Sequence, residues 1–250
     1  MSAPRTRGGP GGALVLHGLT GSPQSVAGLA GALAAAGLKA EVPLLPGHGT
    51  SVDDLLGCRW DDWAGAAQAA FDRVASQGGP VVVAGLSMGG TLAVWLAARR
   101  PEVAGLVVVN PYIDPPATSF CELLRGIRDS GHDRLPAVGG DIADPSARED
   151  AYDAMPVEPL LSLCEALGDV AARLGDVTCP TLLFSSRVDH VVPPVSGDVL
   201  AERVSGPLER VWLDRSFHVA TLDHDRDLIE RRTAAFVTSL FPGSRPRTGA

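Results

Sequence analysis

A short glycine-rich segment, Gly85-Leu86-Ser87-Met88-Gly89-Gly90, places a hydroxyl between an apolar run and a helix-like run. A serine at a tight strand-to-helix turn points its hydroxyl away from the chain, and helix N-terminal N–H groups stabilise negative charge there. Gly85 and Gly89 lack a Cβ, so strand and helix can approach closely. Ser87 is therefore a candidate nucleophile. The alternative is a small-residue loop between two buried elements, because so short a pattern is common by chance.

A serine nucleophile needs a general base, which is most often histidine. Four histidines follow Ser87 in the chain: His132, His190, His218 and His224. His218 follows the last strand-like run and precedes the final helix-like run, which is where the base of a nucleophile–acid–base chain order lies. His224 stands among aspartates at a helix start, His132 lies in an irregular segment, and His190 directly follows the candidate acid. We therefore expect His218 to be the base.

The candidate acid is Asp189, which comes just after the strand-like run 181–185. A carboxylate at the end of that strand could face the loop of the next strand and orient the imidazole of His218. Two other aspartates compete for this role. We expect Asp198 on a helix surface and Asp214 in a structural position at a strand end. The alternative for Asp189 itself is a turn-forming aspartate, a common use of this residue in loops.

Negative charge that develops on a substrate oxygen needs two N–H donors. One should come from Met88, the residue after the nucleophile, and the second from an early strand–helix loop. The segment His17-Gly18-Leu19-Thr20-Gly21 supplies such a loop, with the Leu19 N–H as the expected donor. We expect His17 and His48 to be structural.

The elements that must position these residues follow an alternating pattern. Strand-like segments occur at residues 13–16, 40–44, 81–84, 105–109, 181–185 and 209–213. Helix-like segments occur at 24–36, 60–76, from the serine turn to 99, and at 224–240. Strands that alternate with helices, together with the continuous apolar run at 105–109, predict an α/β fold with a mostly parallel sheet flanked by helices on both sides. Residues 1–250 fit a single domain.

One long segment, residues 112–168, interrupts this alternation. It is rich in Pro, Gly and Asp, contains only short helical patches near 120–128 and 159–167, and has no clear strand. An insertion of this length between two strands is usually functional, so we predict a small cap over the site. The alternative is a surface excursion, which its apolar content disfavours. We expect residues 1–10 and 243–250 to be flexible.

Composition narrows the function classes further. The formal net charge of −8 disfavours a nucleic-acid partner. The four cysteines, Cys58, Cys121, Cys164 and Cys179, are widely spaced, which is not metal-ligand spacing. Free thiols in a cytoplasmic protein are the favoured interpretation, and two disulfides are the alternative. No segment has the pattern of a signal peptide or a membrane span.

Five motifs taken together resemble bacterial monoacylglycerol lipases and the related small carboxylesterases: 17–21, Pro46-Gly47-His48-Gly49, 85–90, 189–194 and 217–223. The resemblance implies an α/β-hydrolase fold with a small cap, and hydrolysis of monoacylglycerols or simple carboxylic esters without metal or cofactor. It also implies a small-molecule acyl ester as substrate and transient contact of the cap with lipid. It assigns the triad to Ser87, Asp189 and His218, and the oxyanion donors to Leu19 and Met88.

Two departures from the family pattern bear on the substrate. Leu19 replaces a common Phe, which changes the shape of the pocket and leaves the backbone donor. In the lipases a segment of the form Tyr-Glu-x-x-Pro places a Glu near the glycerol hydroxyls. Here the matching stretch is Tyr152-Asp153-Ala154-Met155-Pro156, so Asp153 is the expected contact with the alcohol. The alternatives are a broad carboxylesterase without glycerol preference and a non-catalytic binding protein on the same fold.

Overall fold

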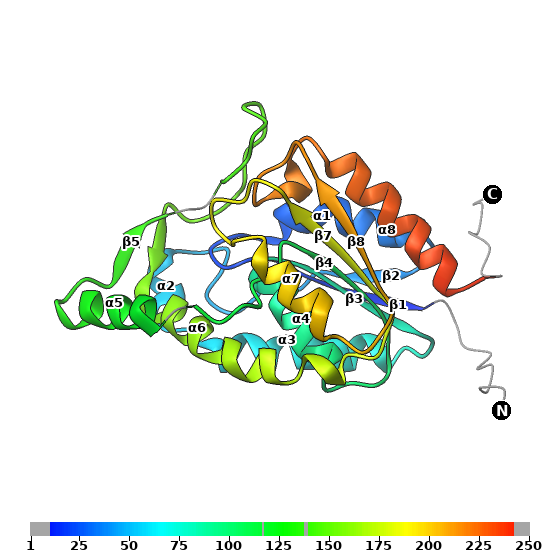
Figure 1. Ribbon diagram of the computed structural model, residues 1–250, viewed down its shortest axis with the longest axis horizontal. Coiled ribbons are helices and arrows are strands. Elements are labelled where there is room, and N and C mark those ends of the chain that lie inside the picture. The colour runs from blue at the N-terminus through cyan, green and yellow to red at the C-terminus, as the bar shows by residue number, and fades with distance from the viewer. Residues whose placement is uncertain (1–10, 117, 138–139, 243–250) are drawn as a thin grey trace.

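The core of the molecule is a six-stranded sheet with the strand order β2-β1-β3-β4-β7-β8 (Figure 1). The computed structural model describes residues 11–116, 118–137 and 140–242, so the flexibility expected of residues 1–10 and 243–250 lies outside the described residues. The strands are β1 Gly12–Leu16, β2 Lys39–Glu41, β3 Val81–Leu86, β4 Val103–Val109, β7 Thr181–Ser186 and β8 Leu208–Leu213. Every pair of neighbours in this sheet is parallel. The predicted mostly parallel sheet is confirmed.

The central strands are buried on both faces because successive side chains enter two different cores. In β1, Leu14 and Leu16 pack into one cluster, while Ala13 and Val15 pack into the other. All four side chains are fully buried. A strand that is buried on both faces consists of consecutive apolar residues, and this pattern made the central strands recognisable in the sequence.

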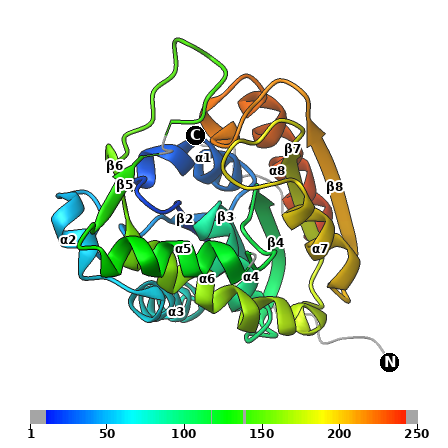
Figure 2. The ribbon, with the colours of Figure 1, turned by 60° about the vertical axis from the view of Figure 1, so that its left-hand side comes forward.

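Helices cover both faces of the sheet (Figures 1 and 2). On one face lie α1 (Ala27–Ala35) and α8 (Arg226–Leu240), which contact each other. On the other face lie α3 (Trp60–Ala75), α4 (Met88–Ala97) and α7 (Val195–Arg203). The short helix α2 spans Val52–Leu56, and three single 3₁₀ turns span Pro23–Val26, Leu174–Asp176 and Ala220–Leu222.

The structure differs from the expected boundaries at a few ends. The first helix-like segment begins as a 3₁₀ turn, capped by the Ser22 hydroxyl that accepts from the Gln24 N–H at 3.3 Å. The chain leaves α1 at Gly37, whose φ of +96° is open to glycine at little cost. The edge strand β2 has three residues, Lys39–Glu41, instead of the expected five. Pro43 explains the early end, because its nitrogen has no hydrogen to donate to a ladder.

Residues 112–168, which we call the cap segment, leave the sheet after β4 and lead back toward β7. The segment carries α5 (Thr118–Asp129), the antiparallel pair β5 (Arg134–Pro136) and β6 (Ala154–Pro156), and most of α6 (Val157–Ala172). The sequence indicated the two helices but neither short strand. The expected boundary at 168 falls inside α6. The apolar side chains of α5 and α6 pack on each other around Leu124, Leu161 and Cys164.

Candidate active site

Ser87 stands in the turn between β3 and α4, in a backbone conformation that is rare for a residue with a side chain. Its φ is +54° and its ψ is −122°. Two main-chain hydrogen bonds hold this turn: Ser87 N–H donates to the Val109 carbonyl at 3.0 Å, and Thr91 N–H donates to the Ser87 carbonyl at 3.0 Å. Strain of this kind costs about 1–3 kcal/mol and persists only where surrounding structure enforces it.

The neighbouring glycines let three backbone segments meet at Ser87. A Cβ on Gly85 would lie 2.2 Å from the Gly89 carbonyl oxygen, and one on Gly89 would lie 2.0 Å from the Leu16 oxygen. A Cβ on Gly18 would be 3.5 Å from the Ser87 Cβ. The loop after β1, which carries Leu19, therefore lies directly against the turn, as the expected pair of N–H donors requires.

His218 and Asp189 form a buried ion pair or hydrogen bond at 2.8 Å, between Nδ1 and Oδ2. Their side chains are 7% and 2% exposed. The second oxygen of Asp189 accepts from the N–H groups of Val191 at 2.9 Å and Val192 at 2.7 Å. Because a carboxylate only accepts hydrogen bonds, Nδ1 of His218 carries a proton, and in the neutral ring Nε2 is left as the acceptor.

The competing aspartates are engaged elsewhere. Asp198 pairs with Arg210, and Asp214 pairs with Arg187 on the exposed side of the loops. Neither hydrogen-bonds to His218.

The loop that carries His218 is fixed by a residue that sequence reasoning did not find. Asn110 follows β4 with a φ of +44°. Its amide nitrogen donates to the His218 carbonyl at 2.8 Å and to the Ser186 hydroxyl at 2.9 Å, and its amide oxygen accepts from the Ser186 N–H at 2.8 Å. Asn110 therefore connects the ends of β4, β7 and the loop after β8. An asparagine after an apolar strand is the only sequence signal for it.

His17 and His48 lie behind the turn and not in the pocket. Nε2 of His17 accepts from the Leu45 N–H at 3.1 Å, and its Nδ1 lies 3.0 Å from the Gly18 carbonyl. Burial, assisted by the neighbouring His48, lowers the pKa of His17 to about 4. A neutral ring that donates from Nδ1 and accepts at Nε2 fits both contacts, so His17 supports the loop as a structural residue.

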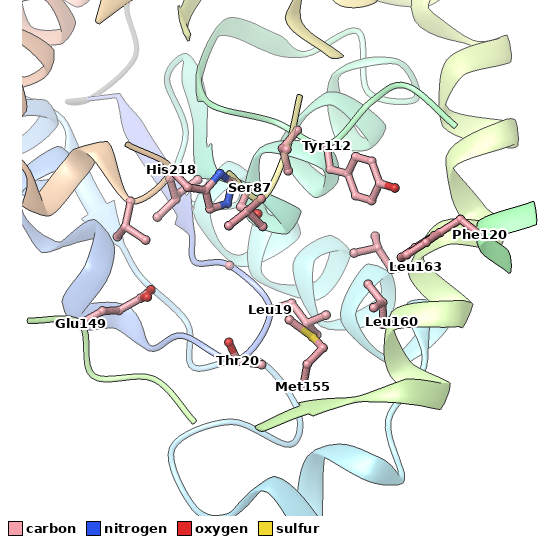
Figure 3. Close-up of a pocket in the computed structure, with 15 residues that line it drawn as sticks. Leu19, Thr20, Ser87, Tyr112, Phe120, Glu149, Met155, Leu160, Leu163 and His218 are labelled. Atoms are coloured by element: carbon pink, nitrogen blue, oxygen red, sulfur yellow. The ribbon is translucent and has the colours of Figure 1, made fainter. Parts of the chain in front are cut away.

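Ser87 and His218 open into one pocket whose two sides differ in polarity (Figure 3). On one side the cap segment and α6 contribute an apolar wall: Tyr112, Phe120, Met155, Leu160 and Leu163. On the other side lie Thr20 and the carboxylate of Glu149, which extends toward the cavity (Figure 3). A molecule bound across Ser87 would therefore have one apolar end and one polar end.

Glu149 supplies a carboxylate to the pocket, although no motif in the sequence marks it. Burial raises the pKa of Glu149, while the Gly140 N–H, 3.1 Å from Oε2, and the nearby His218 oppose that shift. The expected alcohol contact, Asp153, has an exposed side chain and does not line the pocket. Of the stretch 152–156, Met155 is the residue that lines the pocket.

Residues 11–116, 118–137 and 140–242 contain neither a metal-binding cluster nor a membrane-spanning helix. No group of three or more His, Cys, Asp or Glu side chains there could hold a metal ion. No helix in the same ranges is long and apolar enough to cross a membrane.

The chain is similar in sequence and in fold to known enzymes. Residues 11–225 match the family described as Hydrolase_4, serine aminopeptidase S33. The chain is 37% identical over 231 residues to the thermostable monoacylglycerol lipase of Bacillus sp. (strain H-257), covering 91% of this chain and 90% of that protein. It is 25% identical over 237 residues to a carboxylesterase of Bacillus subtilis (strain 168), covering 94% and 95%.

A solved structure of a metagenome-derived lipolytic enzyme superposes with a TM-score of 0.87 at 36% identity, covering 93% of this chain and 95% of that one. The resemblance inferred from the five sequence motifs is thereby confirmed, and so is the expected fold class. The chain belongs to the Hydrolase_4 family of α/β-hydrolases, in the branch of bacterial monoacylglycerol lipases and small carboxylesterases, and is a carboxylic ester hydrolase.

Proposed function

We propose that the protein hydrolyses monoacylglycerols to fatty acid and glycerol, with Ser87, His218 and Asp189 as its catalytic triad. His218 Nε2 takes the Ser87 proton as the hydroxyl attacks the ester carbonyl, and the glycerol leaves with a proton from His218. Water then attacks the acyl-enzyme, His218 takes its proton, and the fatty acid is released as Ser87 regains its hydrogen. The observation that carries this proposal is the buried 2.8 Å contact from His218 to Asp189, in a pocket that also holds Ser87.

Asp189 acts by orienting the imidazole and stabilising its charged form. Both Asp189 oxygens already have hydrogen-bond partners, so the carboxylate has one orientation that fits all three contacts. A fixed carboxylate keeps His218 in the tautomer that leaves Nε2 free to accept a proton.

The oxyanion would be held by the N–H groups of Leu19 and Met88. Met88 is the first residue of α4, so its N–H lies at the positive end of the helix dipole. The tight contact of Gly89 with the Leu16 carbonyl fixes the start of α4 against the end of β1, from which the Leu19 loop departs. Donors held by packed backbone need no rearrangement when charge develops.

The two sides of the pocket would bind different parts of the substrate. The acyl chain would lie along Phe120, Leu160 and Leu163, and the glycerol would face Thr20 and Glu149. We assign the hydroxyl contact to Glu149 in place of Asp153. The raised pKa of Glu149 gives the group both a donor and an acceptor oxygen over more of the pH range, which suits a neutral hydroxyl.

Replacing Ser87 with Ala tests the mechanism. Loss of a triad nucleophile lowers turnover on the order of a million-fold, so cleavage of a p-nitrophenyl ester should disappear and a fluorophosphonate probe should no longer label the protein. A Ser87→Ala variant with near-normal activity would rule out this mechanism. Absence of labelling in the unaltered protein would favour a non-catalytic binding protein.

Replacing Glu149 with Leu tests the glycerol assignment. A lost hydrogen bond of about 1 kcal/mol should raise KM roughly five-fold for a monoacylglycerol and leave KM for the ethyl ester of the same acid unchanged. Asp153→Asn is the matched comparison, since its side chain is exposed. If Asp153→Asn raises KM selectively for the glycerol ester and Glu149→Leu does not, the assignment to Glu149 is wrong.

A broad carboxylesterase for short acyl chains is the second candidate, and the size of the cavity favours it. The pocket has a volume of about 150 Å³, close to that of an engineered cavity that accepts benzene. Measuring kcat/KM over acyl chains of increasing length, as glycerol and ethyl esters, separates the two candidates. No preference for the glycerol esters at any chain length would establish the broad esterase.

We further propose that α5 contacts lipid surfaces transiently. Leu123 is 58% exposed on α5, and Phe120 is 37% exposed while also lining the pocket. Leu123→Ser should lower the rate on emulsified monoacylglycerol and leave the rate on a dissolved short-chain ester unchanged. Equal effects on both substrates would count against lipid contact.

A further inference from the structure

The carboxylate of Asp141 lies between the two loops that carry the proposed acid and base. One of its oxygens, Oδ2, accepts from the N–H of His218 at 3.1 Å and from the N–H of His190 at 3.2 Å. The other, Oδ1, pairs with Nδ1 of the His190 ring at 2.8 Å. The Asp141 side chain is only 14% exposed. A single buried carboxylate thus links the backbone beside Asp189 to the backbone of the base itself.

This link is a second connection between the loops that the Asp189–His218 contact already joins. Asp189 directly precedes His190, so the two loops meet twice: through the Asp189 and His218 side chains, and through Asp141. The backbone contact sets the separation of the loops, and the side-chain contact depends on that separation. The His190 ring adds a third element, since it packs edge-on against Phe217 with ring centroids 4.7 Å apart.

The segment that carries Asp141 is itself anchored at Asp141 and at the residues that follow it. The Asp141 carbonyl accepts from the Val219 N–H at 3.0 Å. Two residues later, the N–H groups of Ala143 and Asp144 donate to the buried carboxylate of Asp223 at 2.7 and 2.9 Å. Asp223 also accepts from the Phe217 N–H at 2.9 Å. Each of the two segments therefore supplies a carboxylate that binds the backbone of the other. Asp141 accepts from the N–H of His218, and Asp223 accepts from the N–H groups of Ala143 and Asp144.

We propose that Asp141 is a positioning residue that sets the distance between the acid and base loops. Three N–H groups converge on its carboxylate, and hydrogen bonds to a charged acceptor are stronger than those between neutral groups. Asp141 touches neither Ser87 nor Nε2 of His218, so it acts on the reaction only through the placement of the triad. The inference rests on the proposed function, because it assigns a purpose to the spacing of the proposed triad.

Asp141→Ala is the direct test. A displacement of about 1 Å in a catalytic group costs on the order of 100-fold in rate, so kcat for a short p-nitrophenyl ester should fall by about that factor. KM should change by less than about three-fold, because Asp141 is not among the residues that line the pocket. The melting temperature and the near-UV circular dichroism of the variant report separately on whether it is folded.

Asp214→Asn is the matched control. Asp214 joins the same two loops through its ion pair with Arg187, but the side chains of that pair are 70% and 56% exposed. An exposed ion pair contributes little to stability or geometry. The control should keep kcat within about two-fold of the unaltered protein.

If Asp141→Ala does not fold, two substitutions at His190 test the positioning role of Asp141 instead. His190→Asn retains a nitrogen donor near the position of Nδ1, whereas His190→Phe retains a ring against Phe217 and loses that donor. Loss of one hydrogen bond to a carboxylate predicts a fall in kcat of about ten-fold for His190→Phe. His190→Asn should recover most of the activity of the unaltered protein.

Two results would overturn the positioning role. One is a folded Asp141→Ala variant with kcat within three-fold of normal, or with KM rising as much as kcat falls. The other is equal activity of His190→Asn and His190→Phe. Ser87→Ala, measured alongside, distinguishes failure of the triad from failure of the Asp141 role. Activity of Ser87→Ala would refute the triad. Loss of activity in Ser87→Ala together with normal activity in Asp141→Ala would refute only the role of Asp141.

Discussion

Gly89 occupies the closest backbone contact in the serine turn, and an alanine cannot fit there without moving the chain. Its Cβ would lie 2.0 Å from the Leu16 carbonyl oxygen and 2.6 Å from that of His17. Ordinary contacts of a Cβ begin at 3.4 Å, so the start of α4 and the end of β1 would have to separate by about 1.4 Å. Both partners are main-chain atoms of buried elements, so neither can rotate away.

The Gly89→Ala substitution should therefore lower both stability and activity. Overpacking of this kind costs about 1–3 kcal/mol, which for a chain of this size is a fall in Tm of roughly 2–12 °C. The same separation moves the Leu19 and Met88 amides apart, because they belong to the two elements that meet at Gly89. A shift of about 1 Å predicts a loss in kcat on the order of 100-fold.

The assay is kcat for a short p-nitrophenyl ester together with Tm from scanning calorimetry. Gly65→Ala is the matched control, since Gly65 lies on an exposed position of α3 and a Cβ there meets nothing within 4 Å. Replacing an interior helix glycine gains about 0.5–1 kcal/mol, so its Tm should rise by roughly 1–4 °C with kcat unchanged. A Gly89→Ala variant with kcat within three-fold of normal would show that the close contact does not position the amides.

Two further predictions concern titration and thiol reactivity. The pKa of His17 is held at about 4 by burial and by the neighbouring His48, whereas histidine in an unfolded chain titrates near 6.5. The unfolded state therefore gains a proton first as the pH falls, and the free energy of unfolding should drop by up to about 3 kcal/mol between pH 6.5 and 4. His17→Gln should flatten that decline in Tm. Burial raises the pKa of Cys164 to about 12 and of Cys179 to about 11. In the native protein at pH 8 both thiols should therefore react with iodoacetamide more slowly than the half-buried Cys121, whereas in urea the three should react equally fast. Mass spectrometry of the alkylated peptides measures these rates.

Much of the fold could be predicted because its central strands are apolar on both faces. In β1, β3 and β4 every second residue enters each core, so burial alone marks the strand. The length of the edge strand β2 was overestimated because apolar residues, Val42 to Leu44, continue past its last paired residue. Within the described ranges β2 pairs with β1 alone. The strands β5 and β6 were missed because three residues are too few to establish a period of two.

The structure brings together Ser87, Asp189 and His218, the three residues that chemistry and chain order single out in the sequence, at one candidate site. The site was not predictable at Asn110, Asp141 or Glu149. Each of these acts through neighbours far away in the sequence, and in an irregular Pro- and Gly-rich segment an Asp or Glu is indistinguishable from a solvated turn residue. The spacing of Tyr152-Asp153 suggested a pocket contact, but the Asp153 side chain is exposed and Met155 is the residue of that stretch that lines the pocket.

The cap segment lies in the crossover between two strands that are partners in the sheet. Val109 at the end of β4 is paired in register with Phe184 of β7. An excursion that leaves and returns at neighbouring strands places no demand on the register of the sheet or on the order of its other strands. The part of the excursion before Asp141, which carries α5 and β5, is therefore free to diverge while Ser87 and His218 stay in place, and it is the natural part to graft from a relative in order to exchange one acyl preference for another.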